Sequence, residues 1–329
     1  MPANLTPQYR AAEERYRAAA DPDEKLAALR EMLAVIPKHK GTEKLQADLK
    51  QRIAKLAHQR EGHGGAKRTT FDHVVREGAG QVALIGPPNG GKSSLLAALT
   101  RAEPAIAAYP FTTHMPQPGM MPFEDVMIQL VDTPAIAAEH TPPWLPGLVR
   151  SADLAVLVVD LTEPTLLEQV DSTLARLMQS RVQLVAPGAA TSLEDPAVAP
   201  VRALVAANRA ELPDAEVGIA LLADLLAGRL PIRPVSAVEK RGLRDLAREL
   251  FTLLDVIRVY AKEPGKPADR ERPFVLKRGA TVADFALNIH RDLVAHLRFA
   301  RVWGAHTFDG QTVHRDHPLA DGDVVELHA

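Results

Sequence analysis

A lysine and a serine end a glycine-rich stretch, Gly86-Pro-Pro-Asn-Gly-Gly-Lys92-Ser93, with the spacing of a phosphate-binding loop. Its paired glycines let successive backbone N–H groups point into one concavity, where they and the start of the next helix meet a polyphosphate. The lysine would reach the β- and γ-phosphates, and the serine hydroxyl would ligate Mg²⁺. A chance lysine after a glycine turn is the alternative, but an apolar strand is expected over 82–85 and an apolar-faced helix over 94–100. The motif therefore indicates nucleotide binding, without distinguishing ATP from GTP.

Two further motifs follow in the order that a nucleotide-controlled switch requires. Thr113 ends the stretch Tyr109-Pro-Phe-Thr-Thr113, 20 residues after Ser93, and a threonine in such a loop closes on Mg²⁺ and the γ-phosphate. Taken alone, this stretch would also suit an ordinary turn. Asp132 follows a strand expected over 126–131, where a carboxylate holds Mg²⁺ through water. The order and spacing of these residues predict a site for magnesium and a nucleotide.

Two later stretches also follow apolar strands and would line the rest of this site. Asn208-Arg-Ala-Glu211 comes after a strand expected over 201–207, and Ser236-Ala-Val238 comes after a strand over 231–235. Strands that alternate with helices predict an α/β fold, with a mostly parallel sheet covered on both faces. Ligands bind at the carboxyl ends of such strands, which is where all of these motifs fall.

Length and composition limit the classes of protein that fit. With 329 residues, a formal net charge of −2 and no cysteine, the chain has room for two or three domains and offers no disulfide or thiolate nucleophile. The near-neutral charge gives no overall attraction to nucleic acid, so any such affinity must come from a local patch. No apolar run approaches the roughly 20 residues that span a bilayer, and the N-terminus has no charged-then-apolar signal. We expect a cytoplasmic protein without a membrane partner.

Changes in pattern divide the chain into three parts. We expect a helical N-terminal region over 1–66, a phosphate-loop domain over 78–260 and a small mixed α+β module over 272–329. The segment 38–68 has nine basic and three acidic residues, an excess of six positive charges. Most charged helix faces are merely solvated, but the sign and clustering also suit a surface that faces RNA or a ribosome.

The periodicity places further elements in the second half of the chain. A helix over 243–257 is expected to close the phosphate-loop domain. In the C-terminal module the pattern predicts a helix over 281–297, preceded by a strand over 274–276 and followed by strands over 299–303 and 324–328.

Taken together, these motifs resemble the TRAFAC-class GTPases of the Obg and developmentally regulated GTP-binding (DRG) group, and the DRG branch most closely. The resemblance covers nearly the whole chain, and the C-terminal module resembles a TGS domain, which is a β-grasp fold. It implies GTP binding, Mg²⁺, slow hydrolysis, and work on ribosomes or RNA. Besides the phosphate loop, the stretches that carry it are His39-Lys-Gly-Thr-Glu-Lys-Leu45, Tyr109-Pro-Phe-Thr-Thr113, Gly279-Ala-Thr-Val-Ala-Asp-Phe285, Phe299-Ala-Arg-Val-Trp-Gly304 and Leu319-Ala-Asp-Gly-Asp-Val-Val325.

The base-reading motif departs from the family pattern. The family has Asn-Lys-x-Asp, and here Arg209 and Glu211 replace the lysine and the aspartate. A carboxylate that accepts hydrogen bonds from guanine N1 and N2 selects guanine over adenine, and Glu211 keeps that carboxylate with one more methylene. Arg209 can keep its aliphatic stem along the base. We therefore expect guanine selectivity to survive.

Three other positions bear on turnover. Ala135 stands where the family has a glycine after Asp-x-Pro, so an N–H for the γ-phosphate remains but the φ freedom of glycine is lost. Ile136 follows, where many small GTPases carry a glutamine that orients water, so intrinsic hydrolysis should be slow. Asn89 resembles the asparagine that helps to hold K⁺ beside the phosphates in potassium-stimulated GTPases, and a cation there would supply transition-state charge.

The sequence thus leads to one main hypothesis, a Mg²⁺-dependent GTPase that hydrolyses GTP to GDP and phosphate and acts as a nucleotide-controlled switch on a ribosome or RNA, with room for a regulatory protein partner. Lys92, Thr113 and Asn89 would act in catalysis, and Ser93, Thr113 and Asp132 would hold Mg²⁺. One alternative is a non-catalytic nucleotide-binding scaffold, and another is an ATP-using phosphotransferase. The residues expected to contact the nucleotide are Gly86, Pro87, Pro88, Asn89, Gly90, Gly91, Lys92, Ser93, Ser94, Thr112, Thr113, Asp132, Ala135, Asn208, Arg209, Glu211, Ser236, Ala237 and Val238.

Overall fold

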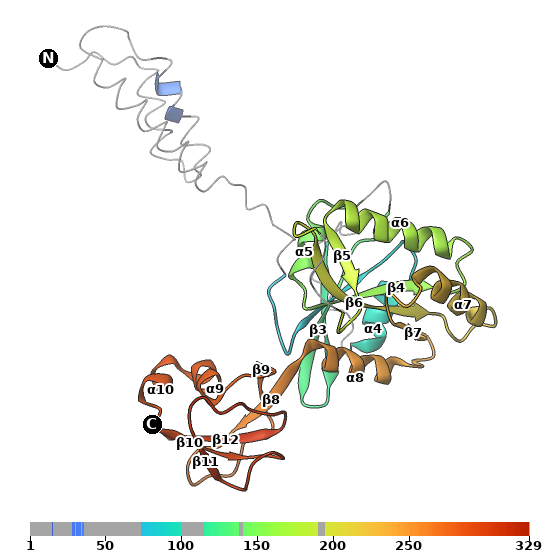
Figure 1. Cartoon of the computed structure of the whole chain (residues 1–329). Coiled ribbons are helices and arrows are strands. Elements are labelled where there is room, and N and C mark those ends of the chain that lie inside the picture. The colour runs from blue at the N-terminus through green and yellow to red at the C-terminus, as the bar shows by residue number, and fades with distance from the viewer. Residues whose placement is uncertain are drawn as a thin grey trace, which may run out of the picture. The chain divides into compact units, whose positions relative to one another are not determined.

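The chain forms two compact units, Met1–Thr70 and Phe71–Ala329. The computed structural model describes residues 15, 28, 29, 31–33, 35, 74–100, 115–137, 141–189 and 195–328 (Figure 1). In the first unit the described residues are helical, and Ala28, Leu29 and Met32 are buried. Most of the helical region predicted over 1–66, including its basic segment, lies outside the described residues.

The second unit begins with a seven-stranded sheet of order β2-β3-β1-β4-β6-β5, in which β7 also pairs with β6. All strand pairs are parallel except β2 with β3. Helices follow most of the strands, as predicted for an α/β fold. The strands are β1 (Gln81–Ile85), β2 (Gln117–Phe123), β3 (Val126–Asp132), β4 (Leu154–Asp160), β5 (Val182–Val185), β6 (Ala199–Asn208) and β7 (Ile232–Pro234). The helices are α4 (Lys92–Leu99), α5 (Leu145–Ser151), α6 (Leu166–Gln179), α7 (Ala215–Leu226) and α8 (Leu243–Leu254).

The two faces of this sheet bury separate apolar cores. Side chains alternate between the faces of a strand, so Ala83 and Ile85 of β1 join one core while Val82 and Leu84 join the other. Helices α5, α6 and α7 cover the first face, and α4 and α8 cover the second (Figure 1). Because β1 and β4 are buried along their whole length, they read as continuous apolar runs in the sequence, and their carboxyl ends are fixed rigidly.

Strand β2 is not among the strands expected from the sequence, and it contains Pro118 and Pro122. It pairs antiparallel with β3 at the edge of the sheet. The two prolines are four residues apart, so they share one orientation in the ladder, and proline is tolerated only where the missing N–H would face away from the neighbouring strand. They therefore leave the outer edge of β2 short of donors, which protects it from pairing with another strand.

The C-terminal module is a five-stranded sheet of order β11-β10-β12-β8-β9, and one main helix packs against it (Figure 1). Thr281 and Asp284 form a capping box at the start of this helix, and Phe285 is fully buried in the core of the module. Its elements are β8 (Val256–Ala261), β9 (Phe274–Lys277), α9 (Val282–Ile289), α10 (Arg291–His296), β10 (Phe299–Trp303), β11 (Gln311–Val313) and β12 (Asp323–His328).

Two expected helices end earlier than the sequence suggested. The helix predicted over 243–257 ends at Leu254, because Asp255 adopts a left-handed conformation with φ 54°. The next residues form β8, which pairs with β9 and β12, so the domain boundary expected at 260 falls inside a strand of the C-terminal sheet. The helix predicted over 281–297 is interrupted at His290, whose backbone is extended.

Arg258 of β8 connects the C-terminal sheet to the turn between β2 and β3. Its guanidinium donates to both carboxylate oxygens of Asp321, and its Nη1 donates to Asp125 (2.9 Å) and to Glu124. Tyr260 also donates its hydroxyl to Asp125. The tip of the β2 and β3 hairpin is therefore held by charge-assisted hydrogen bonds from the C-terminal module.

Candidate functional site

The phosphate-binding loop runs from the end of β1 to the start of α4 and packs tightly against two neighbouring strands. A Cβ on Gly86 or Gly90 would lie 2.3 or 2.5 Å from the carbonyl oxygen of Val158 in β4. A Cβ on Gly91 would lie 2.2 Å from Nδ2 of Asn208 at the end of β6, and Gly91 has φ 90°. Gly86 and Gly90 are therefore required by the close approach of the β4 backbone and Gly91 by that of the Asn208 side chain, and Gly86 and Gly91 also have positive φ.

Lys92 folds back over its own loop. Its ammonium group donates to the carbonyl oxygens of Pro87 (2.7 Å) and Gly86 (3.2 Å), and only 8% of the residue is exposed. Burial lowers the pKa of Lys92, and the negative charge of Asp132 partly opposes this effect. A cation held by two neutral carbonyl oxygens gains further stabilisation when an anionic oxygen approaches, so the site favours phosphate.

Ser93 and Asp132 come together from α4 and β3. The serine hydroxyl donates to Oδ2 of the aspartate at 2.5 Å. Oδ1 of Asp132 is buried and has no hydrogen-bond partner among the described residues. Burial raises the pKa of Asp132, although the bond from Ser93 and the charge of Lys92 both favour its ionised form. A hydroxyl beside a carboxylate with a spare oxygen is a donor set that fits a hydrated Mg²⁺. Thr112 and Thr113 lie outside the described residues.

The chain after Asp132 continues along the phosphate loop. Thr133 donates both its N–H and its hydroxyl to the carbonyl oxygen of Leu84, and the N–H of Ile136 bonds Gly86 at 3.0 Å. Ile136 is 1% exposed and belongs to the core, while Ala135 is half-buried. The side chain at position 136 therefore packs the sheet and is not available to orient water.

Asn89 lies at the tip of the phosphate loop in an unusual conformation. It is exposed and has φ 58°, in the left-handed region that asparagine tolerates better than most residues. Pro88 and Ser94 are also exposed, whereas Pro87 is buried. This geometry suits a turn residue, and the role of Asn89 beside a cation stays a prediction.

The expected base-binding residues lie at the end of β6 and after β6 and β7. Oδ1 of Asn208 accepts a hydrogen bond from the N–H of Ala237 (3.1 Å), so these two stretches are joined directly. Ser236 is fully buried and accepts from the N–H of Glu239, whereas Val238 is 81% exposed. Oε2 of Glu211 is buried and has no hydrogen-bond partner within the described part of the chain. A buried carboxylate oxygen with no donor fits a ligand that brings N–H groups, as a guanine base does.

Asp160 lies at the candidate site, although it belongs to none of the motifs identified in the sequence. At the end of β4 its Oδ1 accepts hydrogen bonds from the N–H and the hydroxyl of Thr162, which is indeed a turn contact. Its other oxygen, Oδ2, lies 3.1 Å from Nη1 of Arg209, which starts the base-binding loop. Asp160 and Asn208 are partners in the parallel register of β4 with β6. That register, rather than any motif, is the signal that could have found the contact.

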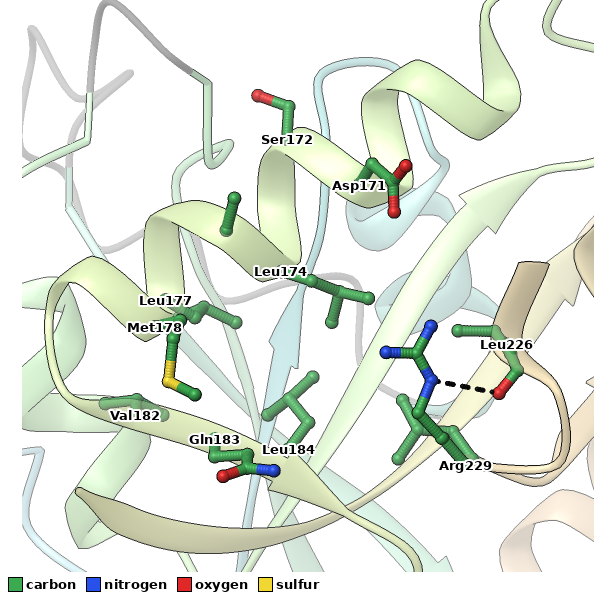
Figure 2. A pocket seen from close by; sticks show the side chains of 12 residues that line it. Asp171, Ser172, Leu174, Leu177, Met178, Val182, Gln183, Leu184, Leu226 and Arg229 are labelled. Atoms are coloured by element: carbon green, nitrogen blue, oxygen red, sulfur yellow. Dashed lines mark hydrogen bonds between the residues drawn. The ribbon is translucent and has the colours of Figure 1, made fainter. Parts of the chain in front are cut away.

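A pocket of about 580 Å³ lies between α6, β5 and the end of α7, and none of the candidate nucleotide-binding residues lines it. Figure 2 shows Leu174, Leu177 and Met178 of α6 opposite Leu184 of β5. Arg229 also lines the pocket. Its guanidinium donates hydrogen bonds to the carbonyl oxygens of Leu226 (3.1 Å, dashed) and Leu225 (2.9 Å). The lining is mainly aliphatic, unlike the phosphate loop.

The family models match both parts of the second unit. The model described as 50S ribosome-binding GTPase matches residues 81–186, and the TGS domain model matches residues 257–329. The first match covers the phosphate loop, Asp132 and Asp160. The second begins inside β8, in agreement with the strand pairing of the C-terminal sheet.

Several relatives align along most of the chain. An uncharacterized GTP-binding protein of Methanocaldococcus jannaschii is 28% identical, over 93% of this chain and 92% of that protein. Developmentally-regulated GTP-binding protein 1 of Xenopus laevis and Ribosome-interacting GTPase 1 of Saccharomyces cerevisiae are each 26% identical, over 92% of this chain and 98% of those proteins.

A solved structure shares the fold. The YchF GTPase of Schizosaccharomyces pombe superposes with a TM-score of 0.51 at 13% identity, over 77% of this chain and 99% of that one, a likeness that concerns the fold alone. None of the described helices is long and apolar enough to cross a membrane. The chain thus has a GTPase domain and a C-terminal TGS domain, and along most of its length it is similar to proteins named developmentally regulated GTP-binding proteins.

Proposed function

We propose that this protein binds GTP together with Mg²⁺ and hydrolyses it to GDP and phosphate. The observation that carries the proposal is the pair formed by Ser93 and Asp132 beside the buried Lys92. The spare oxygen of Asp132 is buried, and an unpartnered carboxylate oxygen costs free energy unless it meets a donor or a cation. Mg²⁺, when bound, neutralises charge on the phosphate oxygens during phosphoryl transfer.

The residues of the chain would then bind, orient and stabilise charge. Lys92 would exchange its bonds to two loop carbonyls for bonds to phosphate oxygens, and the N–H groups at the start of α4 would face the same phosphates. Ser93 and Asp132 would hold the metal, and Thr113 would complete its ligands when the switch closes. Asn208 would connect the phosphate loop to the stretch after β7, since its side chain lies against Gly91 and accepts a hydrogen bond from the N–H of Ala237.

Guanine recognition would rest on Glu211. Its buried Oε2 accepts no hydrogen bond from the described residues, and guanine offers two donors, N1–H and N2–H. Adenine presents an acceptor at N1, so the carboxylate would be left buried and unpaired against ATP. We therefore propose GTP and GDP as the nucleotides.

Hydrolysis would be slow without further help. Ile136 packs in the core, so no side chain at that position orients the attacking water. We propose that K⁺ beside Asn89 supplies part of the missing transition-state charge. Asn89→Ala should abolish any advantage of K⁺ over Na⁺, whereas equal turnover of the unaltered protein in the two salts would contradict this part of the proposal.

The decisive experiment is steady-state phosphate release from GTP with Mg²⁺, in K⁺ and in Na⁺. Lys92→Ala should reduce turnover at least about 100-fold, because it removes a positive charge from the phosphate site. Lys266→Ala, which removes an exposed lysine of the linker before β9, is the matched control and should leave turnover unchanged. Turnover that persists in Lys92→Ala would overturn the proposed site. Binding of GTP without turnover would instead favour a nucleotide-dependent scaffold, with Ala135 as the first position to change to glycine.

We further propose that the nucleotide controls binding to a ribosome or to RNA in the cytoplasm. The proposal is supported by the TGS domain, by the description of the matching GTPase model and by the name of the yeast relative. Co-sedimentation with ribosomes should differ between a non-hydrolysable GTP analogue and GDP. Equal co-sedimentation with both nucleotides, or with neither, would contradict a nucleotide-controlled switch.

A further inference from the structure

The base-binding loop holds two opposite charges only two residues apart. Arg209 and Glu211 both follow β6, and both would be placed at the nucleotide base. A guanidinium and a carboxylate in one loop readily form a bidentate pair. Glu211 in that state would have its oxygens occupied, and it could not accept hydrogen bonds from guanine. The structure shows a different arrangement, which separates these two charges.

Asp160 forms an ion pair with the guanidinium of Arg209. Its Oδ2 lies 3.1 Å from Nη1 of Arg209, while Oε2 of Glu211 is buried without a hydrogen-bond partner in the described part of the chain. The backbone contributes to this choice, because Arg209 has φ 63° and so turns out of the strand direction at once.

Asp160 is itself held in place, which makes it a suitable anchor. Its Oδ1 accepts from both the N–H and the hydroxyl of Thr162, and the residue is 7% exposed. It ends β4, directly beside Asn208 in the parallel register, so its carboxylate stands at the start of the base-binding loop. Arg209, by contrast, keeps half of its side chain exposed and can move if its partner is lost.

We propose that Asp160 is a positioning residue for guanine recognition: by pairing with Arg209, it keeps that guanidinium away from Glu211 and leaves the carboxylate free for the base. The inference rests on the proposed function, in which Glu211 reads guanine. Asp160 does not touch the base. It determines which of two carboxylates neutralises the arginine, and the same pair directs the stem of Arg209 along the loop.

The test compares dissociation constants for GDP and for inosine diphosphate, which lacks the 2-amino group of guanine. The unaltered protein should prefer GDP, because a carboxylate that bonds two donors loses one of them with inosine. In Asp160→Asn the released Arg209 would pair with Glu211, so affinity for GDP should fall about tenfold and the preference should shrink to about twofold or less. A general loss of structure would weaken both nucleotides alike and leave their ratio unchanged.

Removal of Arg209, which competes with the base for Glu211, should restore the preference for GDP over inosine diphosphate. Arg209→Gln alone should keep the ratio of the two dissociation constants, and Asp160→Asn combined with Arg209→Gln should return it to the value of the unaltered protein. Glu163→Gln is the matched control, because it changes a neighbouring carboxylate that accepts a hydrogen bond from the hydroxyl of Thr165. If Asp160→Asn fails to fold, Asp160→Glu can replace it, since this variant moves the carboxylate by only one methylene. Asp160→Glu should reduce the preference for GDP over inosine diphosphate, but by less than is expected of Asp160→Asn.

The outcomes separate this inference from the function beneath it. Glu211→Gln must itself abolish the preference for GDP; if it does not, the proposed reading of guanine fails, and the role of Asp160 fails with it. If Glu211→Gln does abolish the preference while Asp160→Asn leaves it unchanged, only the positioning role is overturned. An unrestored ratio in the double variant would also overturn it, because the loss would then not depend on Arg209.

Discussion

Arg258→Met removes the charge that joins β8 to the β2 and β3 hairpin, and it tests how much that charge contributes to stability. Two distances of 2.7 and 3.0 Å join the guanidinium to Asp321, and a third of 2.9 Å joins it to Asp125. The guanidinium also lies 5.1 Å from the centre of the Phe251 ring. Methionine keeps an unbranched apolar chain against that ring, so the variant removes charge and hydrogen bonds with little loss of packing.

The expected magnitude lies between those of buried and exposed ion pairs. Loss of one partner of a fully buried pair costs about 3–5 kcal/mol, and an exposed pair contributes about 0–1 kcal/mol. The side chain of Arg258 is 15% exposed, and those of Asp125 and Asp321 are 24% and 32% exposed. We therefore expect Arg258→Met to lower the free energy of unfolding of the C-terminal module by about 2 kcal/mol at pH 7.

The pH dependence gives a second readout with a definite sign. Burial raises the pKa of Asp125, but hydrogen bonds from Tyr260 and Arg258 outweigh this effect and leave the pKa below its usual value. The pKa of Asp321 is also lowered, because bonds from Arg258 outweigh its burial. A carboxyl group whose pKa is lower in the folded state contributes stability above its unfolded pKa, and this contribution is lost as pH falls through the folded pKa. The difference between the unaltered protein and Arg258→Met should therefore be full at pH 7 and shrink below about pH 4.

The assay is urea unfolding followed by tryptophan fluorescence, since Trp303 lies in β10 of the C-terminal sheet. Arg233→Met is the matched control: Arg233 pairs with Glu249 at 2.5 and 2.7 Å, but 44% of its side chain is exposed. This variant should cost less than about 1 kcal/mol. If Arg258→Met costs no more than Arg233→Met at pH 7, or if its cost is undiminished at pH 3, the reasoning from burial and pairing is refuted.

Three further substitutions test the site and the C-terminal core. Gly91→Ala should weaken GDP binding at least about tenfold, because φ is 90° and the new Cβ would meet Asn208 at 2.2 Å; Gly188→Ala, with similar φ and open space, is the control in a titration with fluorescent GDP. Thr281→Ala should lower the unfolding free energy by about 1 kcal/mol in urea titrations, since it removes the capping box of α9. Phe285→Ala should cost about 3–5 kcal/mol in the same titrations, and a cost below about 1 kcal/mol would show that the core of the module collapses around the gap.

The strands at the centre of the sheet could be predicted, because a strand that is buried on both faces has an unbroken apolar sequence. β1 and β4 are unbroken apolar runs, and the glycine loop after β1 has a fixed spacing. β2 could not be predicted, since Pro118 and Pro122 normally exclude a strand. It exists because an edge strand needs donors on one side only, and strand order is a tertiary property that local pattern does not contain.

The same distinction explains which part of the candidate site the sequence revealed. Ser93 and Asp132 could be paired by motif spacing, because the loop and β3 belong to one recurring unit. The contact between Asp160 and Arg209 spans β4 and β6, which become neighbours only in the assembled sheet. The bonds of Asp160 with Thr162 are local in sequence, whereas the contact of its second oxygen with Arg209 cannot be read from neighbouring residues. In a parallel sheet, a polar residue that ends one strand should be compared with the first residues after each adjacent strand, because those positions share one edge whatever their separation in sequence.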